Sequence, residues 1–277
     1  MPKISRWFSL FLALGAYSVV LSVVLVLLIE FEVIHLGFMT YVIVFQTLAF
    51  GVPFLGYCWR TKKPIGEILP FRRLDAKNLG LVVGITLCMM PIMATLSALS
   101  TLWAPNYVAE VLEDATFTYP FLLTLFAVGV MPSVLEELVF RGVFVAETRH
   151  FSLHRMAILN GVMFGLIHMN LQQLLYTFVL GVLFCYLLHY TGNILVPIIS
   201  HFIINGLNIS MVYAITATEA LTEYTPYPPA EYEDISIWMI VGVMAAISLV
   251  FTPLLVFLFK VLIARNKPAQ IAPSLEI

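Results

Sequence analysis

The chain has 277 residues, of which 61% are hydrophobic and only 11% are charged, and its mean hydropathy is +0.98. An ordinary soluble domain carries about 25% charged residues. This composition leaves too few polar side chains to cover a water-facing surface, so it excludes an ordinary soluble protein and indicates a polytopic membrane protein. The net charge of −2 predicts no nucleic-acid partner.

The first apolar run begins close to the N-terminus. Lys3 and Arg6 precede it, and it extends over residues 7–29. A cleaved signal peptide has a shorter apolar core that is followed by a small-residue cleavage site. We therefore expect an uncleaved first transmembrane helix.

Further apolar runs predict the remaining spans, since a membrane-crossing helix needs roughly 20 apolar residues. The fourth run is expected to continue past Pro132 as a second, more polar helix, and the fifth is short. The fold class is therefore all-α: a transmembrane helical bundle of about eight spans, forming one integral membrane domain over residues 1–277. The predicted spans are 7–29, 36–59, 78–103, 119–135, 156–168, 171–189, 194–215 and 235–259.

The distribution of charge predicts the orientation. With eight spans, thirteen of the fourteen basic residues fall on one side, and the remaining one, Arg141, lies within a membrane segment. The segments on the other side, including the expected loops around Glu110 and from Thr216 onward, carry acidic residues. The positive-inside rule makes the basic side cytoplasmic. We predict that both termini are cytoplasmic and that the protein is a multi-pass protein of the cell membrane, with membrane lipids among its partners.

The most informative stretch is Glu136-Glu137-x-x-x-Arg141, which follows a long run without charge. Ionisable groups at membrane depth are expensive and mark functional sites by default. On a helix, Glu137 and Arg141 are four residues apart and share a face. Glu136 points about 140° away from Arg141 at 100° per residue. The spacing therefore predicts that Arg141 pairs with Glu137 and that Glu136 is free for another role.

A structural explanation for Glu136 also exists. Ser133-Val134-Leu135-Glu136 fits a capping box, in which Ser133 is the N-cap and Glu136 bonds back to its amide. Pro132, directly before it, makes a helix break at this point plausible. This alternative stays open at the level of the sequence.

Three more polar side chains lie inside apolar helices. His168 ends the short run after Phe164, and His201 lies one turn before Asn205 on the same helix face. Buried polar groups in membranes need partners on neighbouring helices. Together with Glu136, these side chains supply a general base, a second group that handles protons, and donors suited to an oxyanion. This set is suited to the addition of water to a carbonyl group.

Several known protease signatures are missing. The chain contains no His-Glu-x-x-His, no Gly-x-Ser-Gly-like nucleophile turn and no Gly-x-Gly-Asp. These absences argue against zinc proteases of that type, serine rhomboids and presenilin-type aspartyl proteases. The three cysteines lie singly in apolar runs, which is typical of small buried side chains rather than of disulfides or metal ligands.

The ordered set Glu136-Glu137-x-x-x-Arg141, Phe164-x-x-x-His168 and His201-x-x-x-Asn205 resembles the three motifs of the CAAX protease and bacteriocin-processing (CPBP) family. That family includes the Ras-converting CAAX prenyl endopeptidases. The motif-bearing core is expected at about 119–213.

The resemblance implies a peptidase that hydrolyses a peptide bond of a membrane-associated protein or peptide. By resemblance, Glu136 and His168 activate water, His201 and Asn205 stabilise the oxyanion, and Glu137 with Arg141 supports the site. The substrate is either a prenylated protein or a leader- or bacteriocin-type peptide. No cofactor is expected, with zinc on a Glu, His, His set as the alternative.

The same residues admit two other functions. Glu and His side chains in a membrane also relay protons in transporters, so a proton-coupled transporter is the first alternative. A non-catalytic immunity protein of the same fold is the second.

Overall fold

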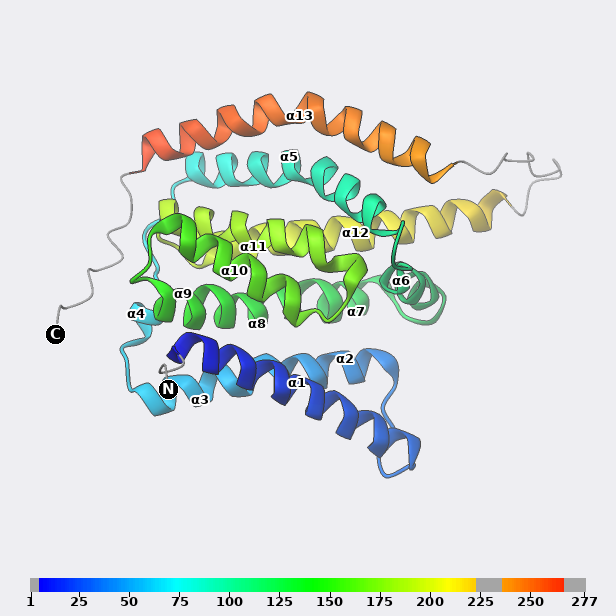
Figure 1. The fold of residues 1–277 in the computed structure, drawn as a ribbon. Helices are drawn as coiled ribbons and strands as arrows, with labels where there is room; N and C mark the ends of the chain where they lie inside the picture. The colour runs from blue at the N-terminus through cyan, green and yellow to red at the C-terminus, as the bar shows by residue number, and fades with distance from the viewer. Residues whose placement is uncertain (1–4, 223–235, 267–277) are drawn as a thin grey trace.

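The computed structural model describes residues 5–222 and 236–266. Within them the chain is a bundle of α-helices joined by short connections, as Figure 1 shows. Three π-helical segments, η1 to η3, interrupt two of the long helices. The elements are α1 (Arg6–Glu30), α2 (Phe38–Gln46), η1 (Thr47–Gly51), α3 (Val52–Thr61), α4 (Ile65–Ile68), α5 (Ala76–Ser100), α6 (Tyr107–Thr118), α7 (Phe121–Thr124), η2 (Leu125–Val130), α8 (Met131–Glu137), η3 (Leu138–Phe144), α9 (Val145–Thr148), α10 (Leu153–Ile167), α11 (Leu171–Thr191), α12 (Leu195–Thr222) and α13 (Ile237–Arg265).

The all-α polytopic architecture predicted from composition is confirmed. In the described ranges, seven helices or continuous helical segments are long and apolar enough to cross a membrane. The predicted fifth span is α10, which has 15 residues. At 1.5 Å per residue it is about 22 Å long, shorter than the roughly 30 Å of a bilayer core. Residues 5–222 and 236–266 therefore combine seven helical segments long enough to cross a membrane with the short apolar helix α10, which packs along α11.

The order of the helices in space explains which of them hold the site (Figure 1). The α7–α9 segment lies between the α1–α3 hairpin on one side and the layer of α10, α11 and α12 on the other, and α5 and α13 pack together beyond that layer. The α7–α9 segment and α11 are among the most buried spans, whereas α13 has no buried residue in its most apolar window. Functional side chains on the central segment are therefore shielded from the bundle surface.

The predicted break at Pro132 is wrong, and so is the end of the fourth span at residue 135. Helical structure continues from Phe121 to Thr148. Proline lacks an N–H for the carbonyl four residues before it, but neighbouring groups can satisfy that carbonyl within a membrane. The π-helical segments η2 and η3 flank α8 on both sides, so the helix adjusts its hydrogen bonding instead of ending.

The capping box at Ser133 is also contradicted. Ser133 lies inside the continuous helix, and its hydroxyl donates to the carbonyl of Gly129 at 2.7 Å. A serine that bonds back by one turn is a common arrangement within helices. Glu136 is consequently released from a capping role and is available to the site.

Two regions expected to be irregular are partly helical. The acidic region around Glu110 forms α6, and the loop expected from Thr216 begins as a continuation of α12 to Thr222. The rest of that loop, and the predicted start of the last span at residue 235, lie outside the described residues.

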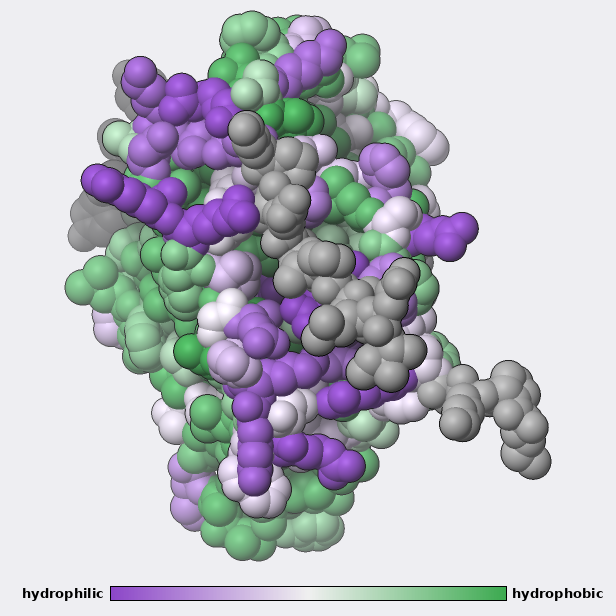
Figure 2. Space-filling model, turned by 90° about the vertical axis from the view of Figure 1, so that its left-hand side faces the viewer, coloured by the Kyte–Doolittle hydropathy of each residue, from purple (hydrophilic) through white to green (hydrophobic). Residues whose placement is uncertain are grey.

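One end of the bundle gathers the basic side chains. Figure 2 shows this end, where hydrophilic residues spread over the face on which α1 begins and α13 ends. Glu147 at the end of α9 binds Lys63 at 3.1 Å and Arg6 at 3.4 Å, and also accepts a hydrogen bond from Tyr57. The first and last described helices thus have their terminal ends on one side of the bundle. That this side is cytoplasmic stays a prediction.

Candidate active site

The central helix carries a buried ion pair. Arg141 Nη1 donates to Glu137 Oε1 at 3.1 Å, and both side chains are 0% exposed. This is the pairing that the four-residue spacing predicted, and it is confirmed. Arg141 Nη2 also donates to the carbonyl of Gly181 on α11 at 3.2 Å. Taking two charges out of water is expensive unless they are paired and hydrogen-bonded, so this cluster joins α8–η3 firmly to α11.

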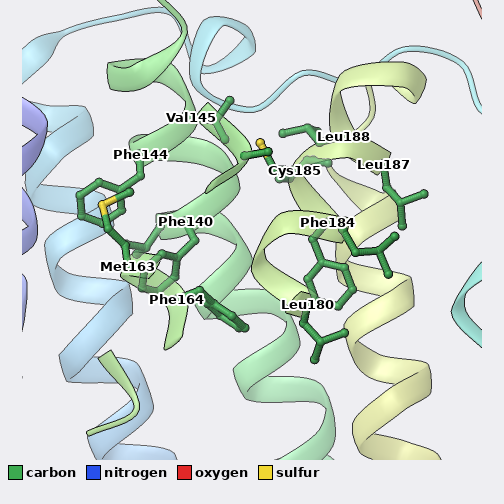
Figure 3. Packing of buried hydrophobic residues seen from close by; sticks show 14 of the residues in the cluster. Phe140, Phe144, Val145, Met163, Phe164, Leu180, Phe184, Cys185, Leu187 and Leu188 are labelled. Carbon is green, nitrogen blue, oxygen red and sulfur yellow. The ribbon is translucent and has the colours of Figure 1, made fainter. Parts of the chain in front are cut away.

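Aromatic rings cover the arginine on two sides. The Arg141 Cζ atom lies 4.4 Å from the centroid of the Phe164 ring and 5.0 Å from that of Phe184. Figure 3 shows Phe164 and Phe184 among the packed apolar side chains of this region. Cation–π contacts strengthen when the cation is desolvated. The guanidinium is therefore held by its surroundings and is unsuited to moving during a reaction.

Glu136 faces the other way, into a cavity of about 430 Å³. The cavity is lined from α1 by Ser18 and Ser22, among others, from α2 by Gln46, from α8 by Glu136 and from the end of α10 by His168. Glu136 is 5% exposed. Its Oε1 atom accepts a hydrogen bond from Gln46 Nε2 at 3.2 Å, and its Oε2 atom has no partner among the described residues.

His168 is held by the end of its own helix. Its Nδ1 atom lies 2.7 Å from the carbonyl oxygen of Phe164, so Nδ1 carries the proton and donates to that oxygen. This leaves Nε2 as the acceptor in the neutral ring. The next residue, Met169, has a positive φ of 49°, a conformation that side chains other than glycine rarely adopt. This turn ends α10 at the cavity and leads directly into α11.

His201 and Asn205 lie one turn apart on α12, as predicted, but neither lines this cavity. His201 Nδ1 is 3.0 Å from Glu137 Oε1, so the histidine joins the ion pair rather than the cavity wall. Asn205 Nδ2 donates to the carbonyl of Val128 at 3.3 Å. The ring of Phe164 packs against both His168 and His201, with centroids 5.0 Å and 5.8 Å apart.

The structure therefore places five of the six predicted site residues in two adjoining groups, whereas Asn205 binds the carbonyl of Val128. Glu136 and His168 share the cavity, whereas Glu137, Arg141 and His201 form a buried cluster directly behind it. The adjacent positions of the two glutamates join the groups. Gln46 was not identified from the sequence. The available signal was a lone amide side chain in the apolar run 36–59.

The alternative zinc site would draw its ligands from Glu136, His168 and His201. In residues 5–222 and 236–266, no group of three or more His, Cys, Asp or Glu side chains is placed to hold a metal ion. A zinc site needs at least three protein ligands around one point, and here His201 points its Nδ1 at Glu137 while Glu136 and His168 line the cavity.

Comparison with known proteins agrees with the resemblance carried by the three motifs. Residues 118–207, about a third of the chain, match the family model described as "Type II CAAX prenyl endopeptidase Rce1-like". No curated protein and no solved structure matched the chain. The matched segment contains all three motifs, from Glu136 to Asn205. Through this segment, the chain is similar to the CAAX prenyl endopeptidases of the CAAX protease and bacteriocin-processing family.

Proposed function

We propose that the protein is a glutamate-dependent intramembrane endopeptidase that hydrolyses a peptide bond of a membrane-associated substrate. One observation carries the proposal. Glu136 and His168, 32 residues apart in the chain, line the same cavity in the bundle. A carboxylate and an imidazole in one cavity are the two groups that general acid–base hydrolysis of an amide needs. The family match supports the same class of reaction.

The step begins with a water molecule at Glu136. The free Oε2 atom takes a proton from the water, and the water oxygen bonds to the scissile carbonyl carbon. The carbonyl oxygen becomes an oxyanion. When the carbon–nitrogen bond breaks, the proton passes to the leaving nitrogen, through Glu136 or through His168. The products are a carboxylic acid and an amine, and Glu136 is ionised again, so atoms and charge balance; transfer of the acid proton to the amine then gives a carboxylate and an ammonium group.

The family resemblance proposes His201 and Asn205 as oxyanion donors. Since neither lines the cavity at Glu136, this role requires that the bound carbonyl group reach beyond that cavity towards α12. Asn205 has two N–H groups on Nδ2, of which one serves the Val128 carbonyl, so the second is free to donate. His201 donates from Nδ1 to Glu137, and donation from Nε2 therefore requires the charged imidazolium. The Glu137 carboxylate that accepts from His201 is shared with Arg141 and orients the imidazole ring. Glu137 and Arg141 would act by holding His201 rather than by touching the substrate.

The family match supports a peptide or protein substrate in a membrane. We propose a lipid-modified or otherwise membrane-bound peptide as the substrate and the cell membrane as the location. A farnesylated peptide ending in a CAAX tetrapeptide and the same peptide without the lipid are the direct probes. Leader- and bacteriocin-type peptides form the second panel.

The test compares Glu136→Gln with the wild type in proteoliposomes at equal expression. General acid–base catalysis contributes roughly 100- to 10,000-fold, and we expect a loss in that range. Glu67→Gln, which changes an exposed carboxylate on α4 in the same way, is the matched control and should leave cleavage unchanged. Undiminished cleavage by Glu136→Gln would remove Glu136 from the mechanism.

Three further measurements separate the alternatives. A metal-free reaction predicts that cleavage persists after dialysis against a chelator, and activity restored only by added zinc would contradict it. Proton-coupled flux of a solute into proteoliposomes, abolished by Glu136→Gln without any peptide cleavage, would instead indicate a transporter. A cellular immunity phenotype that survives loss of both His168 and His201 would indicate a non-catalytic protein.

A further inference from the structure

Gln46 lies at the junction between α2 and the π-helical segment η1, in the hairpin outside the family-matched residues 118–207. Its side chain is half-buried and reaches across to α8, where Nε2 donates to Glu136 Oε1 at 3.2 Å. An amide in an apolar membrane helix needs a polar partner on a neighbouring helix. For Gln46 that partner is the proposed general base.

The chemistry of the two groups determines how they meet. An ionised carboxylate only accepts hydrogen bonds, whereas an amide both donates and accepts. The reverse orientation of the Gln46 amide would place its Oε1 atom against a Glu136 oxygen, which is repulsive. The contact therefore requires that the NH₂ group of Gln46 faces Glu136, and it restrains the Glu136 side chain from the α2 side of the cavity.

This contact also makes the two oxygens of Glu136 different. Oε1 is bound by Gln46, whereas Glu136 Oε2 and Gln46 Oε1 are buried acceptors without a donor among the described residues. Buried acceptors in native proteins are almost always served by a protein donor or a water. A water molecule is small enough for the cavity and brings two donors, and it is the reactant that the proposed hydrolysis needs.

We propose that Gln46 is a positioning residue for Glu136: by binding Oε1, it directs Oε2 of the carboxylate to the nucleophilic water. This inference rests on the proposed role of Glu136 as general base. The α1–α3 hairpin then does more than close the cavity, since it supplies a side chain that orients the base from outside the matched core.

The charged and titratable groups around Glu136 come from three elements. Glu137 and Arg141 lie on its own helix and bind each other, His168 comes from the end of α10, and Tyr176 of α11 is close enough to interact with Glu136 electrostatically. Gln46 is the residue that hydrogen-bonds directly to the Glu136 carboxylate in the described ranges. Exchange of its amide therefore changes the immediate donor without changing the other groups.

The experiment uses three variants of the full chain in proteoliposomes, with the farnesylated CAAX peptide or the best peptide from the substrate panel. Gln46→Met keeps the size of the side chain and removes the donor. We expect kcat to fall 10- to 100-fold with KM unchanged, because misplacement of a reacting group by about 1 Å costs on the order of 100-fold.

Gln46→Glu provides a conditional rescue. Two carboxyl groups at this distance hold one proton between them, and that shared proton can take the place of the amide donor. We expect cleavage close to the wild-type rate at the acidic end of the working range and a decline as the pH rises and the proton leaves. Gln46→Met should stay low at every pH. A role in packing alone would not produce this pH-dependent rescue.

The matched control is Gln172→Met, which removes another buried amide donor, the one that binds Ser97 Oγ at 2.8 Å. It should lower the unfolding temperature at least as much as Gln46→Met and leave kcat unchanged. If Gln46→Met keeps the wild-type kcat while Glu136→Gln abolishes cleavage, the role of Gln46 is overturned and the proposed function stands. If Glu136→Gln cleaves normally, the proposed function itself fails.

Discussion

The side-chain amide of Asn205 on α12 donates to the carbonyl of Val128, which cannot receive a backbone hydrogen bond from Pro132. The two atoms are 3.3 Å apart. Proline at position 132 has no N–H for the carbonyl four residues earlier, and α12 provides a donor from the side. A second carbonyl of this turn, that of Gly129, receives the Ser133 hydroxyl. Asn205 therefore has a structural partner in addition to its proposed catalytic one.

This relationship predicts an energetic coupling between Asn205 and Pro132. Loss of a buried hydrogen-bond donor costs about 1–3 kcal/mol when the acceptor is left unsatisfied. Asn205→Ala should destabilise the protein by about that amount, and less in a Pro132→Ala background, where a backbone N–H becomes available. Unfolding of the four proteins in detergent gives the coupling energy. Equal destabilisation in both backgrounds would show that Val128 does not depend on Asn205.

The same four proteins separate structure from catalysis. If Asn205 also stabilises the oxyanion, the double variant regains stability but not activity. Peptide cleavage measured alongside unfolding distinguishes the two roles. Recovery of both together would make Asn205 a purely structural residue.

The ion pair of Glu137 with Arg141 predicts a large loss of stability when one partner is neutralised. Removal of one member of a buried pair costs about 3–5 kcal/mol because a charge is left buried and unpaired. We expect this effect for Glu137→Gln, with the added loss of a carboxylate partner for His201. Arg265→Gln, which breaks the more exposed pair with Asp75, is the control and should change stability far less. A similar loss in both variants would contradict the prediction.

His168 is expected to act by proton transfer. Its Nδ1–H is bound to the Phe164 carbonyl, which leaves Nε2 as the nitrogen that can accept a proton. His168→Gln places an amide near the position of Nε2 but cannot transfer a proton at neutral pH. We predict a fall in kcat of about 100-fold or more with an unfolding temperature close to that of the wild type. Retained kcat in the glutamine variant would reduce the role of His168 to hydrogen bonding.

The contact between α10 and α11 predicts that glycine is required at their crossing. A Cβ atom on Gly181 would lie 2.6 Å from the Cα atom of Gly161, a distance that forces the helices apart. Gly181→Ala should destabilise the protein by about 1–3 kcal/mol through overpacking and displace the helix that carries His168. Gly80→Ala on α5, where a Cβ atom meets nothing within 4 Å, is the matched control and should be neutral or slightly stabilising. Unfolding and cleavage assays check both variants.

The surroundings of Asp75, directly before α5, predict that the stability of the protein depends on pH. Its side chain accepts from the backbone N–H of Asn78 at 2.7 Å, and Arg265 lies nearby. The Asn78 hydrogen bond first, and then the charge of Arg265, hold the pKa of the Asp75 carboxyl below its usual value. An acid with a lowered folded pKa stabilises the native state above its unfolded pKa and loses that contribution as the pH falls through the folded value.

The difference in unfolding temperature between the wild type and Asp75→Ala should therefore be constant from neutral pH to about pH 5 and shrink below about pH 4. Thermal unfolding at a series of pH values measures it. Asp75→Asn keeps a capping side chain that does not titrate. The difference in unfolding temperature between Asp75→Asn and Asp75→Ala should therefore not change with pH. A difference that grows on acidification would reverse the assigned sign.

The sequence by itself determined the features that depend on one helix at a time. Long apolar runs predicted the spans, because each helix in hydrocarbon satisfies its own backbone and needs only length and an apolar surface. The pairing of Glu137 with Arg141, and the opposite direction of Glu136, followed from the helical period alone. The ordered motifs pointed to the family whose model matches residues 118–207.

Only the tertiary structure decided the contacts between helices, because these depend on which helix packs against which. Pro132 does not end the helix, since Asn205 comes from α12 to bind the carbonyl of Val128. His201 binds Glu137 and does not line the cavity. Gln46 donates a hydrogen bond to Glu136, which lies 90 residues further along the sequence. A polar side chain in a membrane helix needs a hydrogen-bond partner, but the sequence of that helix does not show which neighbouring helix provides it. The packing of the bundle makes that choice.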